Sequence, residues 1–252
     1  MNKSGDMAHE NDPGEQTGGR ALRLNLVESS SPWDEKATVR DIIHSYSDLI
    51  IRSYCLVRFR VIPTRFLDEL SQYIPDHGRI LDLGCGFGLF SLFFAITHPK
   101  AQFVGVDVSA SRVQTARLSA KKLGVENVEF LCNDARNTGP NLGGFDTVIT
   151  LDLMHHIPVV DGDSLIQTVH RDLLMPEGRF LLKDVTTHPR SMLYFTFLLD
   201  LFMNPGASFF YRDVGAWTDA LYAAGFLGVE RHYLWDILPY PHILLVAQKG
   251  KA

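Results

Sequence analysis

Two hydrophobic patterns take turns along this chain from about residue 76 onward. Short apolar runs predict strands near 79–83, 102–106, 128–131, 145–151 and 178–185. Between them, apolar residues recur every three or four positions and predict helices over 89–96, 109–123 and 163–174. Because the strands are apolar throughout, the alternation predicts a parallel sheet whose two faces are both covered by helices.

The first 75 residues follow other patterns. Residues 1–31 are rich in Gly, Asn, Asp and Glu and show no periodicity, which predicts a disordered tail. An apolar stripe over 41–54 predicts an amphipathic helix, and Pro63 is placed to open a second helix with a stripe over 66–73. Residues 32–75 are therefore predicted to form a helical cap on a domain that spans 76–252.

The C-terminal part breaks the strand–helix alternation. A long apolar insertion covers about 188–211, and a helix is predicted over 213–224. Two further strands, at about 228–235 and 242–248, are separated by a Pro-Tyr-Pro turn. Their proximity predicts an antiparallel hairpin at the end of the domain.

Composition and charge exclude several classes of protein. With 252 residues, 46% of them hydrophobic, the chain can bury a full core, and its net charge of −5 offers no general attraction to nucleic acid. The three cysteines match neither a disulfide framework nor a zinc site. The N-terminus lacks the apolar core of a signal peptide, and the apolar run over 192–203 is too short to span a bilayer. We therefore expect a cytoplasmic protein without a nucleic-acid partner.

A glycine-rich loop joins the first predicted strand to its helix. Its sequence is Asp82-Leu-Gly84-Cys-Gly86-Phe-Gly88. Glycines allow the backbone to turn sharply and a ligand to approach it closely, and the helix that follows offers unpaired N–H groups. A dinucleotide fingerprint needs a small residue at position 89, where this chain has Leu89. The loop therefore indicates a nucleotide-like ligand but disfavours an NAD-dependent oxidoreductase.

Four motifs resemble those of a known family. The segment RILDLGCGFG resembles motif I of the class I S-adenosylmethionine (SAM)-dependent methyltransferases. In the same order follow Asp107 in GVDVS, Asp134-Ala135 in FLCNDA, and the segment FDTVITLDLMHHIP with His155 and His156. The resemblance extends over 79–249. It implies a three-layer α/β, Rossmann-like fold with a mostly parallel seven-stranded sheet and a C-terminal antiparallel hairpin.

The resemblance also implies how SAM, and its product S-adenosylhomocysteine (SAH), would be held. An ionised Asp107 can accept both hydrogen bonds of a ribose diol, and Val108 can pack on the adenine. Asp134 would accept from the adenine amino group. The cofactor contacts implied are Asp82, Gly84, Cys85, Gly86, Gly88, Asp107, Val108, Asp134, Ala135 and Leu151.

The acceptor side is less defined by sequence. One of His155 and His156 acts as a general base, or the pair packs beside the cofactor as a shape element. Asp184, at the end of the fifth predicted strand, either contacts the substrate or caps the loop. No carboxylates are spaced like a magnesium site, so we expect no metal.

Aromatic residues suggest what the acceptor contacts. Tyr194, Phe210 and Tyr211 in the apolar insertion would roof a pocket for an apolar molecule, with Tyr46 or Tyr54 closing it from the cap. The alternative is that the insertion packs in the core or forms an oligomer face. Basic residues of the cap either rest on an anionic membrane surface or are simply solvated.

Two functional hypotheses follow. The first is transfer of a methyl group from SAM to an oxygen, carbon or nitrogen of a hydrophobic or aromatic small molecule. The second is a methyltransferase-like module that binds SAM or a partner without turnover, because the sequence identifies no unambiguous base.

Overall fold

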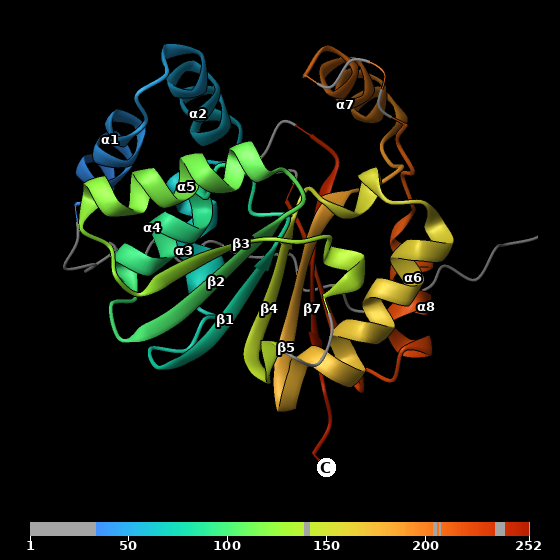
Figure 1. The fold of residues 1–252 in the computed structure, drawn as a ribbon. Coiled ribbons are helices and arrows are strands. Elements are labelled where there is room, and N and C mark those ends of the chain that lie inside the picture. Colours follow the sequence, from blue (N-terminus) through green and yellow to red (C-terminus); the bar gives the residue numbers. More distant parts are fainter. Residues whose placement is uncertain (1–33, 139–141, 204–205, 207, 235–239, 252) are drawn as a thin grey trace, which may run out of the picture.

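A seven-stranded sheet forms the middle layer of the molecule (Figure 1). The computed structural model describes residues 34–138, 142–203, 206, 208–234 and 240–251. The strands are β1 (Gly78–Leu83), β2 (Ala101–Asp107), β3 (Val128–Cys132), β4 (Phe145–Leu151), β5 (Leu174–Val185), β6 (Gly228–Tyr233) and β7 (His242–Gln248). Their order is β3-β2-β1-β4-β5-β7-β6, and only β7 runs antiparallel to its neighbours. The predicted fold class and the C-terminal hairpin are confirmed.

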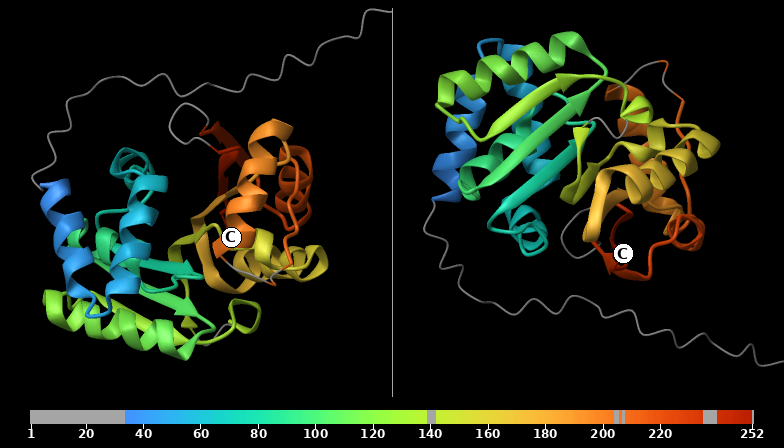
Figure 2. Two further views of the ribbon diagram at one scale, coloured as in Figure 1. Left: turned by 90° about the horizontal axis from the view of Figure 1, so that it is seen from above. Right: turned by 60° about the horizontal axis from the view of Figure 1, so that its bottom comes forward.

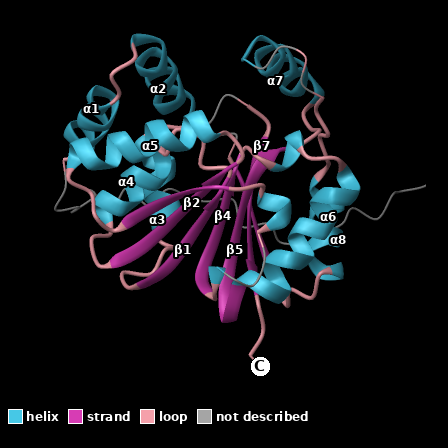
Figure 3. Cartoon of the chain, in the orientation of Figure 1, coloured by secondary structure: helices cyan, strands magenta, loops and turns pink. Residues whose placement is uncertain are grey.

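Helices cover both faces of this sheet (Figure 3). They are α1 (Glu35–Ser45), α2 (Leu49–Val61), α3 (Thr64–Ser71), α4 (Leu89–Thr97), α5 (Ala110–Leu123), α6 (Val159–Thr168), α7 (Arg190–Met203) and α8 (Val214–Ala223), with short turns η1 (Ala135–Asn137), η3 (Met154–His156) and η4 (Val169–Leu173). Leu181 of β5 packs in the core shared with α1–α5, whereas its neighbours Phe180 and Leu182 pack in the core shared with α6 and α8. Successive side chains of a buried strand point to opposite faces of the sheet, so each strand contributes to two hydrophobic cores.

The N-terminal region differs from its prediction. The tail predicted at 1–31 lies outside the described residues. The single helix predicted over 41–54 is two helices, because the Asp48 carboxylate caps α2 by accepting hydrogen bonds from the N–H groups of Ile50, at 2.7 Å, and Ile51. Helices α1–α3 share one core with α4 and α5, so the division into a cap and a domain stays a prediction.

Two other boundaries were misplaced. Helix α6 begins at Val159, directly after Pro158, four residues before its predicted start at Asp163. It ends at Thr168 and is followed by the π-turn η4, so β5 begins at Leu174 rather than at Gly178. A register shift in the β4–β5 pairing accommodates the added residues.

Helices α2 and α7 stand on opposite sides of the end of the sheet to which the parallel strands point (Figures 1 and 2). Helix α7 is the core of the predicted apolar insertion. Within the described ranges, no helix combines the length and apolarity needed to cross a bilayer. Ligands of open α/β sheets bind at the carboxyl ends of the strands, so this end of the sheet is where a site is expected.

Candidate active site

A cavity of about 380 Å³ opens at the carboxyl ends of the strands. It is lined by Ile50, Ile51, Tyr54, Val57, Arg58, Val61, Asp82, Gly84, Cys85, Gly86, Phe87, Leu89, Phe90, Asp107, Arg112, Leu151, Asp152, Leu153, His155, His156, Val185, Thr196, Tyr240 and His242. We call the part formed by Asp82, Gly84, Cys85, Gly86 and Asp107 the cofactor half. The acceptor half is formed by α2 and by Asp152, His155, His156, Tyr240 and His242.

The glycine loop and Asp107 build the cofactor half. The backbone N–H of Gly86 donates to one carboxylate oxygen of Asp107 at 3.0 Å, and the N–H of Ser109 donates to the other at 2.9 Å. These bonds hold the carboxylate against the cavity. Gly86 has φ 57°, and nothing lies within 4 Å of the position that a Cβ would occupy, so the loop leaves open space beside this carboxylate.

Asp82 lies beneath the loop and is almost completely buried. Its carboxyl accepts a hydrogen bond of 2.5 Å from the Ser91 hydroxyl. Burial raises the pKa of Asp82 to about 6, and the nearby charge of Asp107 adds to the rise. Asp82 is therefore suited to bind a cationic group, because a positive charge nearby would stabilise the ionised form of this buried carboxyl.

Six of the ten predicted cofactor residues line the cavity: Asp82, Gly84, Cys85, Gly86, Asp107 and Leu151. Gly88 does not; it begins α4 in a left-handed conformation, and a Cβ there would lie 2.6 Å from the Phe130 ring. The Val108 side chain is exposed beside Asp107. Gly88 is therefore required by packing, and its contact with the cofactor stays a prediction.

The predicted adenine contacts lie outside the cavity. The Asp134 carboxylate is held by the Arg136 guanidinium at 2.6 Å and also caps η1. Arg136 lowers the pKa of Asp134 by this hydrogen bond. Ala135 begins η1 and is buried. An adenine amino group would share Asp134 with Arg136, so the roles of Asp134, Ala135 and Val108 stay predictions.

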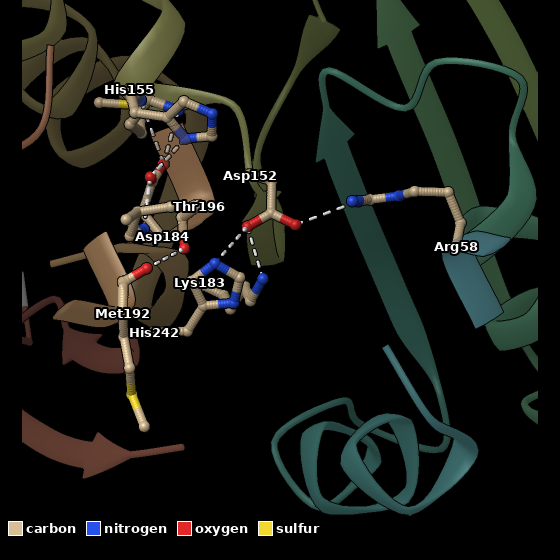
Figure 4. Close-up of polar contacts among 10 residues, drawn as sticks. Arg58, Asp152, His155, Lys183, Asp184, Met192, Thr196 and His242 are labelled. Atoms are coloured by element: carbon tan, nitrogen blue, oxygen red, sulfur yellow. Dashed lines mark hydrogen bonds and ion pairs between the residues drawn. The ribbon is translucent and has the colours of Figure 1, made fainter. Parts of the chain in front are cut away.

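A histidine–carboxylate pair lies in the acceptor half (Figure 4). The His155 Nδ1 is 2.6 Å from an Asp184 carboxylate oxygen, and both side chains are buried. The same carboxylate accepts backbone N–H bonds from Met154, His155 and Val185, at 2.8, 3.2 and 2.7 Å. Because the carboxylate accepts, Nδ1 carries the hydrogen and Nε2 carries the lone pair of the neutral ring.

The neighbouring His156 differs from His155. Its ring centroid is 4.1 Å from that of His155, and its side chain keeps contact with solvent. Loss of water around the ring and the charge of His155 lower the pKa of His156. A lower pKa makes His156 a weaker proton acceptor than an ordinary histidine. Both histidines line the cavity, but only His155 has a carboxylate that orients it.

Buried charges meet beside this pair. The Lys183 ammonium, fully buried on β5, lies 2.5 Å from the Asp152 carboxylate, and Arg58 of α2 reaches the other oxygen of Asp152 at 3.1 Å (Figure 4). His242 Nε2 is 4.0 Å from Asp152. Asp152 has φ 57°, a left-handed conformation that the two cations and the cavity wall hold in place.

The pKa directions in this group follow from burial and pairing. Burial alone would raise the pKa of Asp152, but Lys183 and its neighbours outweigh it and hold that pKa well below the usual value. Burial lowers the pKa of Lys183, and Asp152 offsets part of that effect. Burial and Lys183 hold the pKa of His242 well below its usual value. Asp152 therefore serves as the fixed anion of the acceptor half.

Five of the six predicted substrate residues do not line the cavity. Tyr46 is buried, and its hydroxyl donates to the Phe87 carbonyl at 3.0 Å. Asp184 is buried and its oxygens are used by His155 and the backbone. The others are Tyr194, Phe210 and Tyr211; Tyr54 alone of the six lines the cavity.

The three predicted substrate residues of the insertion lie outside the cavity lining, each in a different place. Tyr194 is exposed on α7. The Phe210 N–H donates to the His155 carbonyl at 2.8 Å, and the Tyr211 ring stacks on the His155 ring at 5.7 Å between centroids. Phe210 and Tyr211 therefore support His155 from behind and do not roof the cavity.

The sequence reasoning missed the cation side of the acceptor half. Arg58, Lys183 and His242 come from α2, β5 and β7, which are far apart in the chain. One pattern could have drawn attention to them: Lys183-Asp184 interrupts the apolar strand FLLKDV, and charges in a buried strand need partners. Nothing in the sequence pattern identifies Arg58, which lies on a helix with several other arginines.

The cofactor half fits the SAM that the motifs imply. Asp107 offers a carboxylate to a diol, Gly86 keeps the approach free of a side chain, and Asp82 offers a buried acceptor to an ammonium group. The cofactor half offers carboxylates and backbone, and Arg112 also lines the cavity. Leu151 also lines the cavity.

Comparisons with known proteins agree with this geometry. Residues 80–178 match the family described as Methyltransferase domain. A ubiquinone biosynthesis O-methyltransferase of Pseudomonas aeruginosa is 27% identical over 158 residues, which cover 55% of this chain and 66% of that protein. The chain thus spans less than two thirds of the curated relatives that it first matches.

Solved structures share the fold. The apo form of the SAM-dependent methyltransferase SibL has a TM-score of 0.65 and 19% identity, over 83% of this chain and 61% of that one. The [4+2]-cyclase SpnF has a TM-score of 0.57 and 20% identity, over 75% of this chain and 81% of that one. At these identities the structures establish the fold and leave the reaction to the site.

Proposed function

We propose that this chain, whose residues 80–178 match the family described as Methyltransferase domain, transfers the methyl group of SAM to a hydroxyl oxygen of a hydrophobic small molecule. The observation that carries the proposal is a single cavity that contains both halves. Asp107 and the glycine loop line one part of it, and the oriented His155 lines the other.

The cofactor half would hold the donor. When bound, SAM supplies a methyl group on a positively charged sulfur, and its transfer forms a carbon–oxygen bond while the carbon–sulfur bond breaks with its electrons left on sulfur. Asp107 would bind the ribose hydroxyls and Asp82 the ammonium group. Binding and orientation by these residues, together with exclusion of water, are the main contributions that a protein makes to such a reaction.

His155 would take the proton that the acceptor hydroxyl loses. Its Nδ1 donates to Asp184, so Nε2 is the ring nitrogen that would form the new N–H bond. The charge that then develops on the ring is stabilised by the Asp184 carboxylate. Asp184 acts through His155 and is a positioning residue.

The cavity wall supports a hydrophobic acceptor. Ile50, Ile51, Val57 and Val61 of α2 line it, with Phe90 beneath them. The name of the Pseudomonas aeruginosa relative, an O-methyltransferase, supports oxygen over carbon or nitrogen as the accepting atom. A carbon or nitrogen acceptor would lose its proton from a different atom, and the assay below includes both classes.

The test is a methyl-transfer assay on the full chain. Calorimetry first measures the binding of SAM and SAH, and SAH formation is then followed with panels of phenols, enols, amines and activated carbon acids. We expect micromolar SAM binding and SAH release with the phenol or enol panel. SAM binding without SAH above the acceptor-free blank in any panel would refute the proposal, as would no SAM binding by folded protein.

A second function has one specific observation in its favour. SpnF, whose fold is similar, is described as a [4+2]-cyclase, so this fold also carries a reaction not named as methyl transfer. The alternative for this chain is a SAM-binding or interaction module without turnover. It predicts that SAM binds but that no acceptor releases SAH, the same result that refutes the first proposal.

Other expectations stay predictions. Cytoplasmic location is supported by Cys55, Cys85 and Cys132, all within the described residues and all free thiols. The absence of a nucleic-acid partner rests on the charge of −5. Oligomer formation through the apolar insertion and the expected absence of a metal are untested.

A further inference from the structure

Helices α2 and α7 stand apart at the same end of the sheet (Figure 2), and both expose apolar side chains. On α2 these are Leu49, Ile50, Leu56 and Val57, and on α7 they are Tyr194, Phe195, Phe197, Leu198 and Leu201. Contiguous apolar surface of this kind marks a place where something apolar binds. Its relation to the cavity indicates what that is.

On the α2 side, the cavity wall and the exposed face share residues. Ile50 lines the cavity although its side chain is 80% exposed, and Val57 lines it while 44% exposed. Tyr54, between them on the helix, lines the cavity and meets the Phe87 ring edge-on at 5.4 Å. The apolar wall therefore continues out of the cavity without a polar break at these positions.

On the α7 side, ring contacts make the same connection. Tyr240 lines the cavity, and the exposed Phe195 stacks on it with centroids 5.8 Å apart. His156 also lines the cavity. The ring centroid of Phe209 is 5.4 Å from that of His156, and the ring centroid of Phe197 is 6.2 Å from that of Phe209. Two aromatic paths thus lead from the acceptor half to the outer face of α7.

We propose that the space between α2 and α7 is a slot for the apolar tail of an amphiphilic acceptor. The polar head of that acceptor lies at the inner end, where His155, Asp152 and His242 line the cavity, and its tail runs outward past Ile50 and Phe195. Charged and hydrogen-bonding groups inside and apolar groups outside match such a molecule in polarity. The inference rests on the proposed function and names its substrate class.

The alternatives are a second copy of the chain or a lipid surface covering these helices. A second copy seated on both faces would close the mouth through which the acceptor must enter. The slot explains instead why both exposed faces connect to cavity-lining residues. Each alternative has its own outcome in the experiment.

The experiment measures affinity as a function of tail length. Phenols that share one head but carry 4-methyl, 4-butyl, 4-hexyl or 4-octyl tails are titrated into the full chain by calorimetry, with SAH present. Burial of each added methylene should tighten binding about fourfold, until the tail extends beyond the slot. The same compounds are assayed for methyl transfer.

Two charged substitutions test the walls, each with a matched control. Ile50→Glu and Phe195→Glu should flatten the dependence of the affinity on tail length, and both variants should stay folded, since exposed substitutions rarely unfold a protein. Val160→Glu and Leu118→Glu are the controls, because their side chains are exposed to a similar extent. Val160 is 79% exposed against 80% for Ile50, and Leu118 is 58% exposed against 55% for Phe195.

The outcomes separate this inference from the function on which it rests. Tail-dependent binding that the two slot variants abolish supports the slot, even if no phenol is methylated, and in that case the proposed function fails alone. Methyl transfer without tail dependence overturns the slot and leaves the function standing. If either slot variant instead dissolves a dimer or abolishes sedimentation with phosphatidylglycerol vesicles, while the tail series is unchanged, the slot is refuted in favour of a second copy or a lipid surface.

Discussion

The two halves of the cavity are built from different materials. In the cofactor half, backbone atoms of one glycine loop and two carboxylates, Asp82 and Asp107, come from one strand–helix–strand unit. In the acceptor half, side chains from α2, the ends of β4 and β5, and the start of β7 meet around Asp152. Backbone and two carboxylates make a generic binding surface, whereas a set of individual side chains makes a specific one. We therefore expect the choice of acceptor to depend on the acceptor half.

The halves also differ in what they cost to fold. The cofactor half buries two carboxylates with no basic side chain of the described residues paired to either, whereas the acceptor half buries Lys183 completely against Asp152, whose side chain is 11% exposed. The attraction within a buried ion pair offsets the free-energy cost of removing both charges from water only when the two groups are well paired. The Lys183–Asp152–Arg58 arrangement thus serves position and charge in the cavity more than it serves stability.

Replacing His155 should have the largest effect on activity. His155→Gln is expected to lower kcat by about 100- to 10,000-fold, because a general base contributes that much, while the Kd for SAM stays within about twofold. Steady-state kinetics and calorimetry measure the two quantities. The matched control is His156→Gln, which should lower kcat by less than about tenfold. An equal loss in both variants would assign the pair a shared shape role.

Removing Lys183 alone should lower the stability of the protein, because it leaves a buried carboxylate without its closest partner. Lys183→Met leaves the Asp152 charge short of its closest partner and should lower the free energy of unfolding by about 3–5 kcal/mol in urea titrations. Adding Asp152→Asn should recover part of the loss, since asparagine tolerates the left-handed conformation at that position. Lys121→Met, on the exposed face of α5, is the control. A loss below about 1 kcal/mol would mean that Lys183 is not the essential partner.

Asp107 should control cofactor affinity. Two charge-assisted hydrogen bonds to a diol disappear in Asp107→Ala, and the Kd for SAM is expected to rise about 100- to 1,000-fold. Asp219→Ala, an exposed carboxylate on α8, should leave that Kd unchanged. If the Kd changes by less than about tenfold in Asp107→Ala, the ribose assignment is wrong.

Asp82 should give the smallest effect, seen as a pH dependence. Burial raises its pKa from 3.8 to about 6, so the folded protein binds this proton more tightly than the unfolded chain. Its contribution to stability is complete below about pH 4 and is lost as the pH rises through 6, by at most about 3 kcal/mol.

Asp82→Asn should remove that dependence. The difference in unfolding free energy between variant and parent, measured in urea from pH 4 to pH 8, is expected to shift in favour of the variant as the pH rises. A difference that is constant over this range would show that Asp82 titrates normally in the folded protein.

The elements of the fold were largely predictable where the cause was local. Ser109 caps α5 and Gly124 ends it in a left-handed conformation, as their residue types imply. Strand β4 has its predicted bounds. The break between α1 and α2 was missed because the apolar stripe continues through it, and only the Asp48 cap and the buried Tyr46 reveal the turn.

The site divides along the same line. Asp82, Gly86 and Asp107 could be identified because they belong to motifs within a short stretch of chain. Tyr211 stacks on His155 outside the cavity lining, a position that aromatic composition alone could not specify, and its contact with the substrate stays a prediction. Arg58 was not identified because its partner, Asp152, is 94 residues away.

By itself, the amino-acid sequence determined the alternation of strands and helices, the resemblance to methyltransferases and the glycine loop beside Asp107, because hydrophobic period, caps, motifs and glycine conformations act over a few residues. Only the tertiary structure decided that His155 is held by Asp184, that Lys183 and Arg58 share Asp152, and that α2 and α7 face each other across the cavity mouth. Those relations depend on which strands pair and which helix faces meet, and they arise from the packing of the whole chain.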